Sequence, residues 1–170
     1  MQAIVAVDQN WAIGQDGDQL CYLPPDLKRF QRRTTGHPVL LGRKTLATFP
    51  GGRPLKNRRN LILSRNPAFA PEGGEVFSAL DEALAAAPAD TFVIGGESLY
   101  RQTLDRCDTV YVTKLHRRFP GADRFFPNLD QAPAWVLAEV EGPYVYGDLA
   151  YTYCTNRRRE AYDNSARLGP

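Results

Sequence analysis

The sequence predicts a single α/β domain built around a mostly parallel sheet. Short apolar runs alternate with helical patterns along most of its 170 residues, an order typical of parallel strands joined by helices. The last two apolar runs have no helical pattern between them, which predicts an antiparallel edge to the sheet. Hydrophobic residues make up 43% and charged residues 24%, the balance of a folded chain rather than a disordered one.

The first strand is expected at residues 2–7, where apolar residues follow one another as in a central strand that is buried on both faces. Residues 8–24 contain scattered Gly and Asp without a period, so we expect a long irregular loop there. Loops of this length in a compact domain are usually functional.

A helix is expected at residues 25–34, because proline suits a first turn and the positions after it separate into an apolar side and a basic side. The basic side consists of Arg29, Arg32 and Arg33. The remaining elements alternate in the same way: strands at 38–42, 60–64, 91–95, 109–115, 135–141 and 149–156, and helices at 43–47, 78–87 and after Gly95-Gly96 to about Thr103. Residues 1–159 are expected to form the domain, and residues 160–170, which carry no pattern, a surface tail.

The composition excludes several classes of protein. The three cysteines, Cys21, Cys107 and Cys154, are odd in number and widely spaced, so with only His37 and His116 beside them they predict neither a disulfide framework nor a metal site. No apolar run approaches the roughly 20 residues of a membrane helix, and the N-terminal run is too short for a signal peptide. A net charge of +2 does not indicate nucleic-acid binding. We expect a cytoplasmic protein.

One carboxylate stands out at the start of the expected helix at 25–34. Two prolines place Asp26 in the first turn. It could simply complement the helix dipole there. Alternatively, it could point into a cleft beside Phe30, one turn further on, and bind a cationic or amidine-like group.

Groups that suit an anion follow three of the expected strands. The segments are Gly42-Arg43-Lys44-Thr45, Ser64-Arg65 and Ile94-Gly95-Gly96. Neither a Walker loop nor a GxGxxG fingerprint is present. Taken alone, the segment at 42–45 could be a solvated basic turn, and Gly95-Gly96 could be a turn with a purely structural role. Because ligands of open α/β sheets bind at the carboxyl ends of the strands, the three together predict a nucleotide-binding enzyme.

A fourth basic set surrounds Pro54-Leu55 in the loop before residues 60–64. Its members are Arg53, Lys56, Arg58 and Arg59. Four cations in seven residues suit an anionic substrate tail, since an arginine can bind a carboxylate through two parallel hydrogen bonds. A solvated basic loop is the alternative.

In order along the chain, these segments resemble the motifs of the dihydrofolate reductase family. The resemblance covers about residues 4–154 and is carried by Ala6, Ile13-Gly14, Leu23-Pro24-Pro25-Asp26-Leu27, Phe30, Gly42-Arg43-Lys44-Thr45, Arg58-Arg59-Asn60, Ile94-Gly95-Gly96, Tyr100, Thr113 and Phe125-Phe126-Pro127. It implies an eight-stranded, mostly parallel sheet with helices on both faces. It also implies NADPH as the hydride donor, dihydrofolate as the substrate, no metal, and a monomer as the default.

The resemblance implies that Asp26 is the catalytic residue and the only ionisable group of the pterin pocket. There it would raise the basicity of the substrate's N5, with water delivering the proton. Thr113 would hydrogen-bond Asp26 or the pterin, and Arg58 would bind the α-carboxylate of the glutamate tail. The other residues implied to contact the substrate are Ile4, Val5, Leu27, Phe30, Phe49, Leu55, Ile94 and Tyr100.

For the cofactor, the resemblance implies contacts with the adenosine 2′-phosphate, the pyrophosphate and the nicotinamide. The residues are Ala6, Ile13, Gly14, Gly42, Arg43, Lys44, Thr45, Leu63, Ser64, Arg65, Ile94, Gly95, Gly96, Glu97, Ser98, Leu99 and Tyr100. Glu97 departs from what a pyrophosphate needs, because its charge would repel the phosphates unless the side chain pointed away.

A second departure is Leu20-Cys21, where many members of the family carry Pro-Trp. Cys21 could make the activity sensitive to thiol reagents, or it could be a small buried thiol. Two alternative functions also stay open. One is the reductase of a pyrimidine riboside, which shares the fold but needs no partner for a glutamate tail. The other is a non-catalytic pterin- or nucleotide-binding module.

Overall fold

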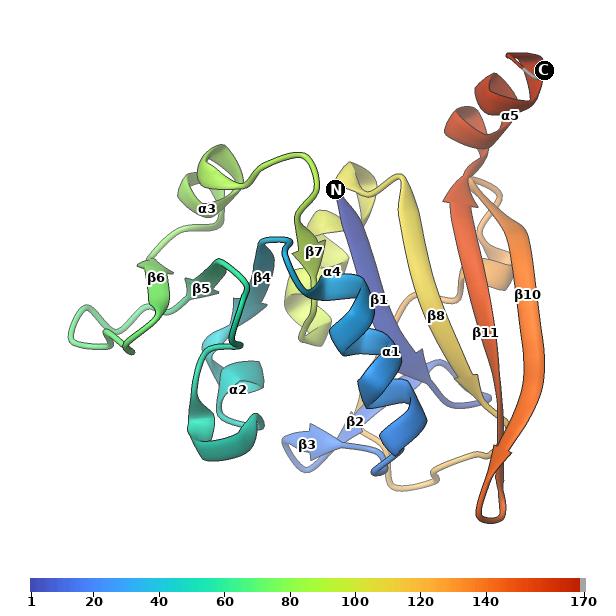
Figure 1. The fold of residues 1–170 in the computed structure, drawn as a ribbon, viewed down its shortest axis with the longest axis horizontal. Helices are drawn as coiled ribbons and strands as arrows, with labels where there is room; N and C mark the ends of the chain where they lie inside the picture. The colour runs from blue at the N-terminus through green and yellow to red at the C-terminus, as the bar shows by residue number, and fades with distance from the viewer. Residues whose placement is uncertain (169–170) are drawn as a thin grey trace.

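The computed structural model describes residues 1–168, and its centre is an eight-stranded sheet in the order β10-β11-β8-β1-β7-β4-β5-β6 (Figure 1). The strands are β1 (Gln2–Val7), β4 (Val39–Gly42), β5 (Asn60–Leu63), β6 (Gly74–Phe77), β7 (Phe92–Val93), β8 (Thr109–Leu115), β10 (Trp135–Tyr146) and β11 (Leu149–Arg158). All pairings are parallel except those of β11 with β8 and with β10. The predicted α/β fold, with its mostly parallel sheet and antiparallel edge, is confirmed.

Two of the three buried apolar clusters lie on opposite faces of the sheet. On β1, Ile4 joins one core and its neighbour Val5 joins the other, as the alternation of side chains along a strand requires. The helices are α1 (Pro24–Thr34), α2 (Arg43–Leu46), α3 (Leu80–Ala86), α4 (Glu97–Thr103) and α5 (Arg159–Arg167). Side chains of α1 and α2 pack on the Ile4 core, and side chains of α3 and α4 on the Val5 core, so helices cover both faces.

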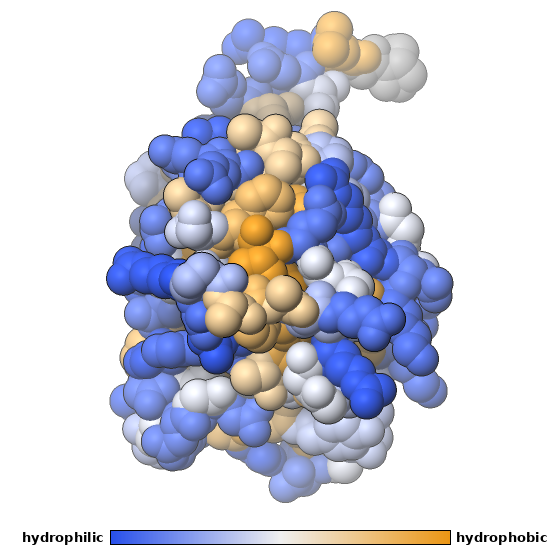
Figure 2. Space-filling model, turned by 90° about the vertical axis from the view of Figure 1, so that its left-hand side faces the viewer, coloured by the Kyte–Doolittle hydropathy of each residue, from blue (hydrophilic) through white to orange (hydrophobic). Residues whose placement is uncertain are grey.

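The end of the molecule that carries α2 and β6 is shown in Figure 2. Apolar side chains gather in a strip down the middle of this face, with charged side chains on both sides. Phe49, Leu55 and Phe69, from the loops that follow α2 and β5, are half-buried against the Ile4 core.

The expectation that residues 8–24 form an irregular loop was wrong in part. They contain β2 (Ala12–Gln15) and β3 (Asp18–Gln19), which form a second sheet with β9 (Arg124–Phe125). The turn between β2 and β3 is Asp16-Gly17, and both residues have positive φ (52° and 80°), as a tight two-residue hairpin demands. The Asp-Gly pair was the sequence signal for this hairpin. The partner strand β9 lies more than 100 residues later and left no local signal.

Two further differences concern elements with little burial. β6 was not predicted, because it is a short edge strand whose side chains are only half-buried or exposed. Residues 160–170 were expected to form a surface tail, and most of this stretch belongs to the helix α5, which the sequence analysis did not predict. That helix projects from the end of β11 and buries none of its residues (Figure 1). Residues 169–170 of the expected tail lie outside the described part of the chain.

Candidate active site

One cavity of about 1800 Å³ collects every residue that was assigned to the substrate and the cofactor. The lining comes from β1 (Ile4, Val5, Ala6), β2 (Ile13, Gly14), α1 (Asp26, Leu27, Phe30), the β4–α2 junction (Gly42, Arg43, Lys44, Thr45), the loop before β5 (Phe49, Leu55, Arg58), the end of β5 (Leu63, Ser64, Arg65), the β7–α4 segment (Ile94, Gly95, Gly96, Glu97, Ser98, Leu99, Tyr100) and β8 (Thr113). The strand ends meet at the carboxyl edge of the sheet, where open α/β folds bind ligands.

Asp26 lies in this cavity and not in bulk solvent. Thr113 Oγ1, on β8, donates a 2.5 Å hydrogen bond to Asp26 Oδ1. Burial raises the pKa of the Asp26 carboxyl, and the Thr113 hydrogen bond and the positive charge of Arg29 oppose that rise. Of the two roles considered for Asp26, the geometry supports the carboxylate in a cleft, because a residue that only complemented the helix dipole would face water.

The helix that carries Asp26 is held on the sheet by arginines. Not all of the arginines on the predicted basic side of α1 face solvent. Arg29 is buried, and its guanidinium carbon lies 3.8 Å from the centre of the Tyr153 ring. Arg33 lies 3.9 Å above the Tyr111 ring in the same manner. The long arginine stems and the ring faces pack α1 in place of aliphatic contacts.

The backbone carbonyl of Ile4, expected to face a pterin, already accepts a hydrogen bond. Tyr100 Oη donates to Ile4 O over 2.7 Å. Burial raises the pKa of the Tyr100 hydroxyl, so it remains a donor. The carbonyl has a second lone pair, so Tyr100 orients this acceptor without using it up.

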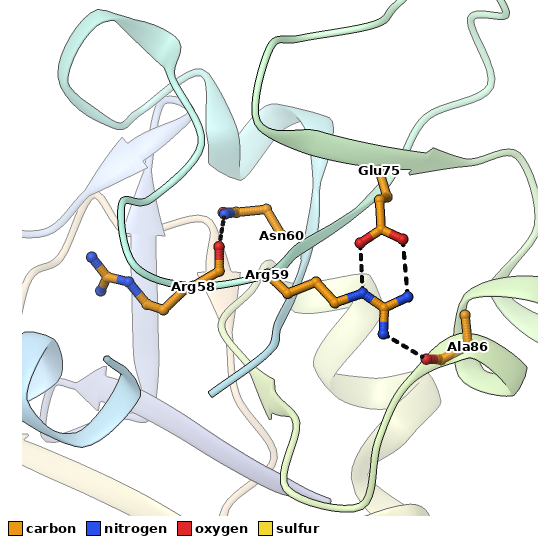
Figure 3. Close-up of polar contacts among 5 residues, drawn as sticks. All are labelled: Arg58, Arg59, Asn60, Glu75 and Ala86. Atoms are coloured by element: carbon orange, nitrogen blue, oxygen red, sulfur yellow. Dashed lines mark hydrogen bonds and ion pairs between the residues drawn. The ribbon is translucent and has the colours of Figure 1, made fainter. Parts of the chain in front are cut away.

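Figure 3 shows that Arg58 and Arg59, although adjacent, point in opposite directions. Arg59 donates to both oxygens of Glu75, at 2.6 and 2.9 Å, and to Ala86 O, so it belongs to the outer edge formed by β6 and α3. Arg58 lines the cavity, and burial lowers the pKa of its guanidinium. Its Nε donates to Lys56 O and its Nη1 to Thr34 Oγ1. These contacts hold the side chain and leave Nη2 for a ligand.

Asn60 shapes the loop that presents Arg58. It is buried, its Nδ2 donates to Leu55 O and to Arg58 O, and its Oδ1 accepts from Leu55 N, each at 2.9 Å. Of the basic set that was predicted around this loop, only Arg58 lines the cavity. The solvated-loop alternative therefore applies to Arg53 and Lys56, which are exposed, whereas Arg59 pairs with Glu75.

The opposite part of the cavity suits phosphate groups. Arg43, Lys44 and Arg65 bring three cations to the ends of β4 and β5. Gly95 has a φ of 125°, and a Cβ at Gly95 or Gly96 would stand 3.4 Å from Thr45 Oγ1. The two glycines thus leave a narrow space in which a ligand can approach the backbone.

Glu97 does not present its charge to that space. Its Oε2 accepts a hydrogen bond from Phe125 N, on β9, so the carboxylate joins α4 to the second sheet. The repulsion considered for this residue is avoided because the side chain points to β9.

Several lining residues were not assigned from the sequence. They include Leu20, Cys21, Tyr22, Leu23, Gln31, Thr48, Ser78, Gln102, Leu115 and Arg124. Those before Pro24 belong to the segment that was predicted to be functional only as a whole. Cys21 packs beside the apolar cluster that contains Leu23 and Leu115, and burial and the charge of Asp26 raise the pKa of its thiol. This favours the small, unreactive thiol over the thiol-sensitive alternative.

Within residues 1–168, no three His, Cys, Asp or Glu side chains come together as metal ligands would. No helix in the same range has the length and apolar character to cross a membrane.

Comparisons with known proteins all point to one family. The family model described as "Dihydrofolate reductase" matches residues 1–157. The dihydrofolate reductase of Bacillus subtilis is 38% identical over 156 residues (87% of this chain and 91% of the relative), and dihydrofolate reductase type 3 of Salmonella typhimurium is 41% identical over 127 residues (74% and 76%). The structure of a dihydrofolate reductase from Enterococcus faecalis, complexed with NADP(H) and RAB-propyl, superposes with a TM-score of 0.80 at 35% identity and covers 93% of this chain and 95% of that one.

Proposed function

Because the chain belongs to the dihydrofolate reductase family, we propose that Asp26 is the catalytic residue of its reaction. That reaction is the NADPH-dependent reduction of dihydrofolate to tetrahydrofolate. The observation that carries the assignment is the Asp26 carboxylate inside the cavity, held by Thr113 and opposite the cations at the ends of β4 and β5. The pyrimidine-riboside reductase, one alternative left open by the sequence, does not agree with the family membership. The other alternative, a non-catalytic module, is tested by the assay below.

The residues of the cavity fit NADPH. When bound, NADPH supplies the hydride that reduces the pterin ring. Arg43, Ser64 and Arg65 would hold the adenosine 2′-phosphate, and this phosphate distinguishes NADPH from NADH. Lys44, Thr45 and the Gly95-Gly96 backbone would hold the pyrophosphate, in the space that a Cβ would fill. Ala6, Ile13, Gly14 and Tyr100 would border the nicotinamide.

In the substrate part of the cavity, Asp26 would accept hydrogen bonds from the 2-amino group and the ring N3–H of the pterin. A negative charge at that place raises the basicity of N5, which takes up a proton that comes from solvent. Phe30 and Phe49 would contact the p-aminobenzoyl group, and Arg58 would bind the α-carboxylate of the glutamate tail through its free Nη2. The substrate would thus be held at both ends.

One assay tests the function. The purified protein is mixed with dihydrofolate and NADPH, and the absorbance of the reduced nicotinamide is followed. We expect its consumption to depend on dihydrofolate, and a folded protein that consumes no NADPH would refute the proposal. A pyrimidine riboside offered in place of dihydrofolate should give no turnover.

Thr113→Val tests the support of Asp26. Valine keeps the shape but removes the hydroxyl that stabilises the carboxylate, so the pKa of Asp26 should rise further and turnover at neutral pH should fall roughly tenfold. The measurement is kcat/KM for dihydrofolate. Thr113→Ser, which retains the hydroxyl, should recover most of the activity. Equal activity of the Val and Ser variants would show that the hydrogen bond is unimportant.

We also infer that the enzyme works as a monomer in the cytoplasm and binds no nucleic acid. The net charge of +2 and the three free thiols of Cys21, Cys107 and Cys154 support this inference. Light scattering after gel filtration should give the mass of one chain, about 19.0 kDa. A mass twice as large would contradict the monomer.

A further inference from the structure

Arg29 is a buried cation for which the packing of α1 offers no ionic partner. Its side chain is 7% exposed, and within residues 1–168 no carboxylate oxygen lies within 4.0 Å of its guanidinium. A charge taken out of water in this way is unfavourable unless something compensates for it. The face of the Tyr153 ring compensates in part, at 3.8 Å.

The position of this cation relative to Asp26 follows from the helix and the sheet together. Residues three apart in a helix are neighbours on its surface, so Asp26 and Arg29 lie side by side on α1. Beneath them, Thr113 of β8 and Tyr153 of β11 are register partners on adjacent strands. Asp26 bonds to Thr113 and Arg29 stacks on Tyr153, so two neighbouring helix residues contact two neighbouring sheet residues.

We propose that Arg29 is a positioning residue whose charge, held beside Asp26 by the Tyr153 ring, helps to keep the Asp26 carboxylate ionised in the cavity. The inference rests on the proposed function of Asp26. Arginine remains protonated at every pH at which the enzyme works, so the support is constant. Because no carboxylate of residues 1–168 forms an ion pair with Arg29, no such pair offsets the effect of its positive charge on Asp26.

Other ionisable groups also act on this pair. Arg29 faces Arg33 on α1, Tyr153 on β11 and Glu141 on β10, and its charge also acts on Tyr144 and Cys154. Asp26 acts on Cys21 and Tyr153. Arg33 is the useful comparison, because it makes the same kind of ring contact, with Tyr111, one helical turn further from Asp26.

The test follows the Asp26 carboxyl carbon by NMR as the ligand-free, full-length protein is titrated with acid. The signal is assigned by its loss in Asp26→Asn. In Arg29→Gln and in Arg29→Met, either of which removes the charge, we expect the midpoint to move upward. Roughly tenfold more of the carboxyl should then be protonated at any pH above the midpoint. Arg33→Gln should cause a clearly smaller change, and Arg29→Lys, which keeps the charge, should stay close to the parent.

A midpoint in both neutral variants that moves no more than in Arg33→Gln would overturn the proposal. If neither neutral variant folds, Tyr153→Leu takes their place, because it removes the ring that holds the guanidinium; a raised midpoint supports the proposal and an unchanged one refutes it. The titration uses no substrate and reports no turnover. The proposed function can therefore fail, through full activity of Asp26→Asn, independently of the result for Arg29.

Discussion

Asp26→Asn is expected to lose most of its turnover at neutral pH, by about 10²- to 10⁴-fold, the usual contribution of a positioned acid–base group. Asparagine keeps the shape and can still accept from Thr113, but it carries no negative charge to raise the basicity of N5. The loss should shrink in acid, where the substrate takes up its own proton. The measurement is the rate of NADPH oxidation as a function of pH, at saturating concentrations of both ligands.

The matched control is Asp90→Asn, which makes the same chemical change at an exposed residue that pairs with His37. It should keep the activity of the parent at every pH. An Asp26→Asn enzyme that is equally slow at all pH values would contradict the role assigned to the carboxylate, because acid could then not replace it.

Arg58→Leu is expected to weaken the binding of dihydrofolate by roughly tenfold to a hundredfold, the worth of a charge-assisted pair with a carboxylate, while NADPH binds as before. The reason is the direction of the side chain, which reaches the cavity on the side away from Glu75 (Figure 3). Both affinities can be measured by titrating the protein fluorescence with each ligand separately.

The neighbouring residue supplies the control for Arg58. Arg59→Leu removes an arginine that likewise lies just before β5, but that arginine pairs with Glu75 at the outer edge of the sheet. It should leave both affinities unchanged. If Arg58→Leu weakened NADPH and dihydrofolate equally, the residue would act on the fold of the cavity rather than on the substrate tail.

Much of the fold was predictable because its strands are buried on both faces and therefore show as continuous apolar runs. β1, β4 and β5 were found in this way, and the positions of the ligand-facing residues at their carboxyl ends followed from them. β8 was found instead from its alternation of apolar and other residues. β9 and β6 were missed because they are short and half-exposed, and their pairing depends on partners elsewhere in the chain.

The residues of the site also fall into two groups, those that the sequence marks locally and those that only the fold brings into place. Asp26 was found because two prolines and a helix start mark it locally, and Arg58 because basic residues cluster around it. The burial of Arg29 was not predictable, since an arginine on a helix is normally solvated and only the ring of Tyr153, from β11, takes it out of water. The basic cluster alone did not distinguish Arg58 from Arg59; the family resemblance selected Arg58, and Glu75 of β6 binds Arg59 instead.

A carboxylate that burial has made a weaker acid also lowers the thermodynamic stability of the folded chain at neutral pH. Since the pKa of Asp26 is higher in the folded than in the unfolded state, the folded state holds its proton to higher pH. The contribution of this group to the free energy of unfolding therefore falls as the pH rises from the ordinary pKa of aspartate, about 3.9, through the folded pKa. Asp26→Asn should consequently melt at a higher temperature than the parent at neutral pH, so that the loss of catalysis comes with a gain in resistance to heat.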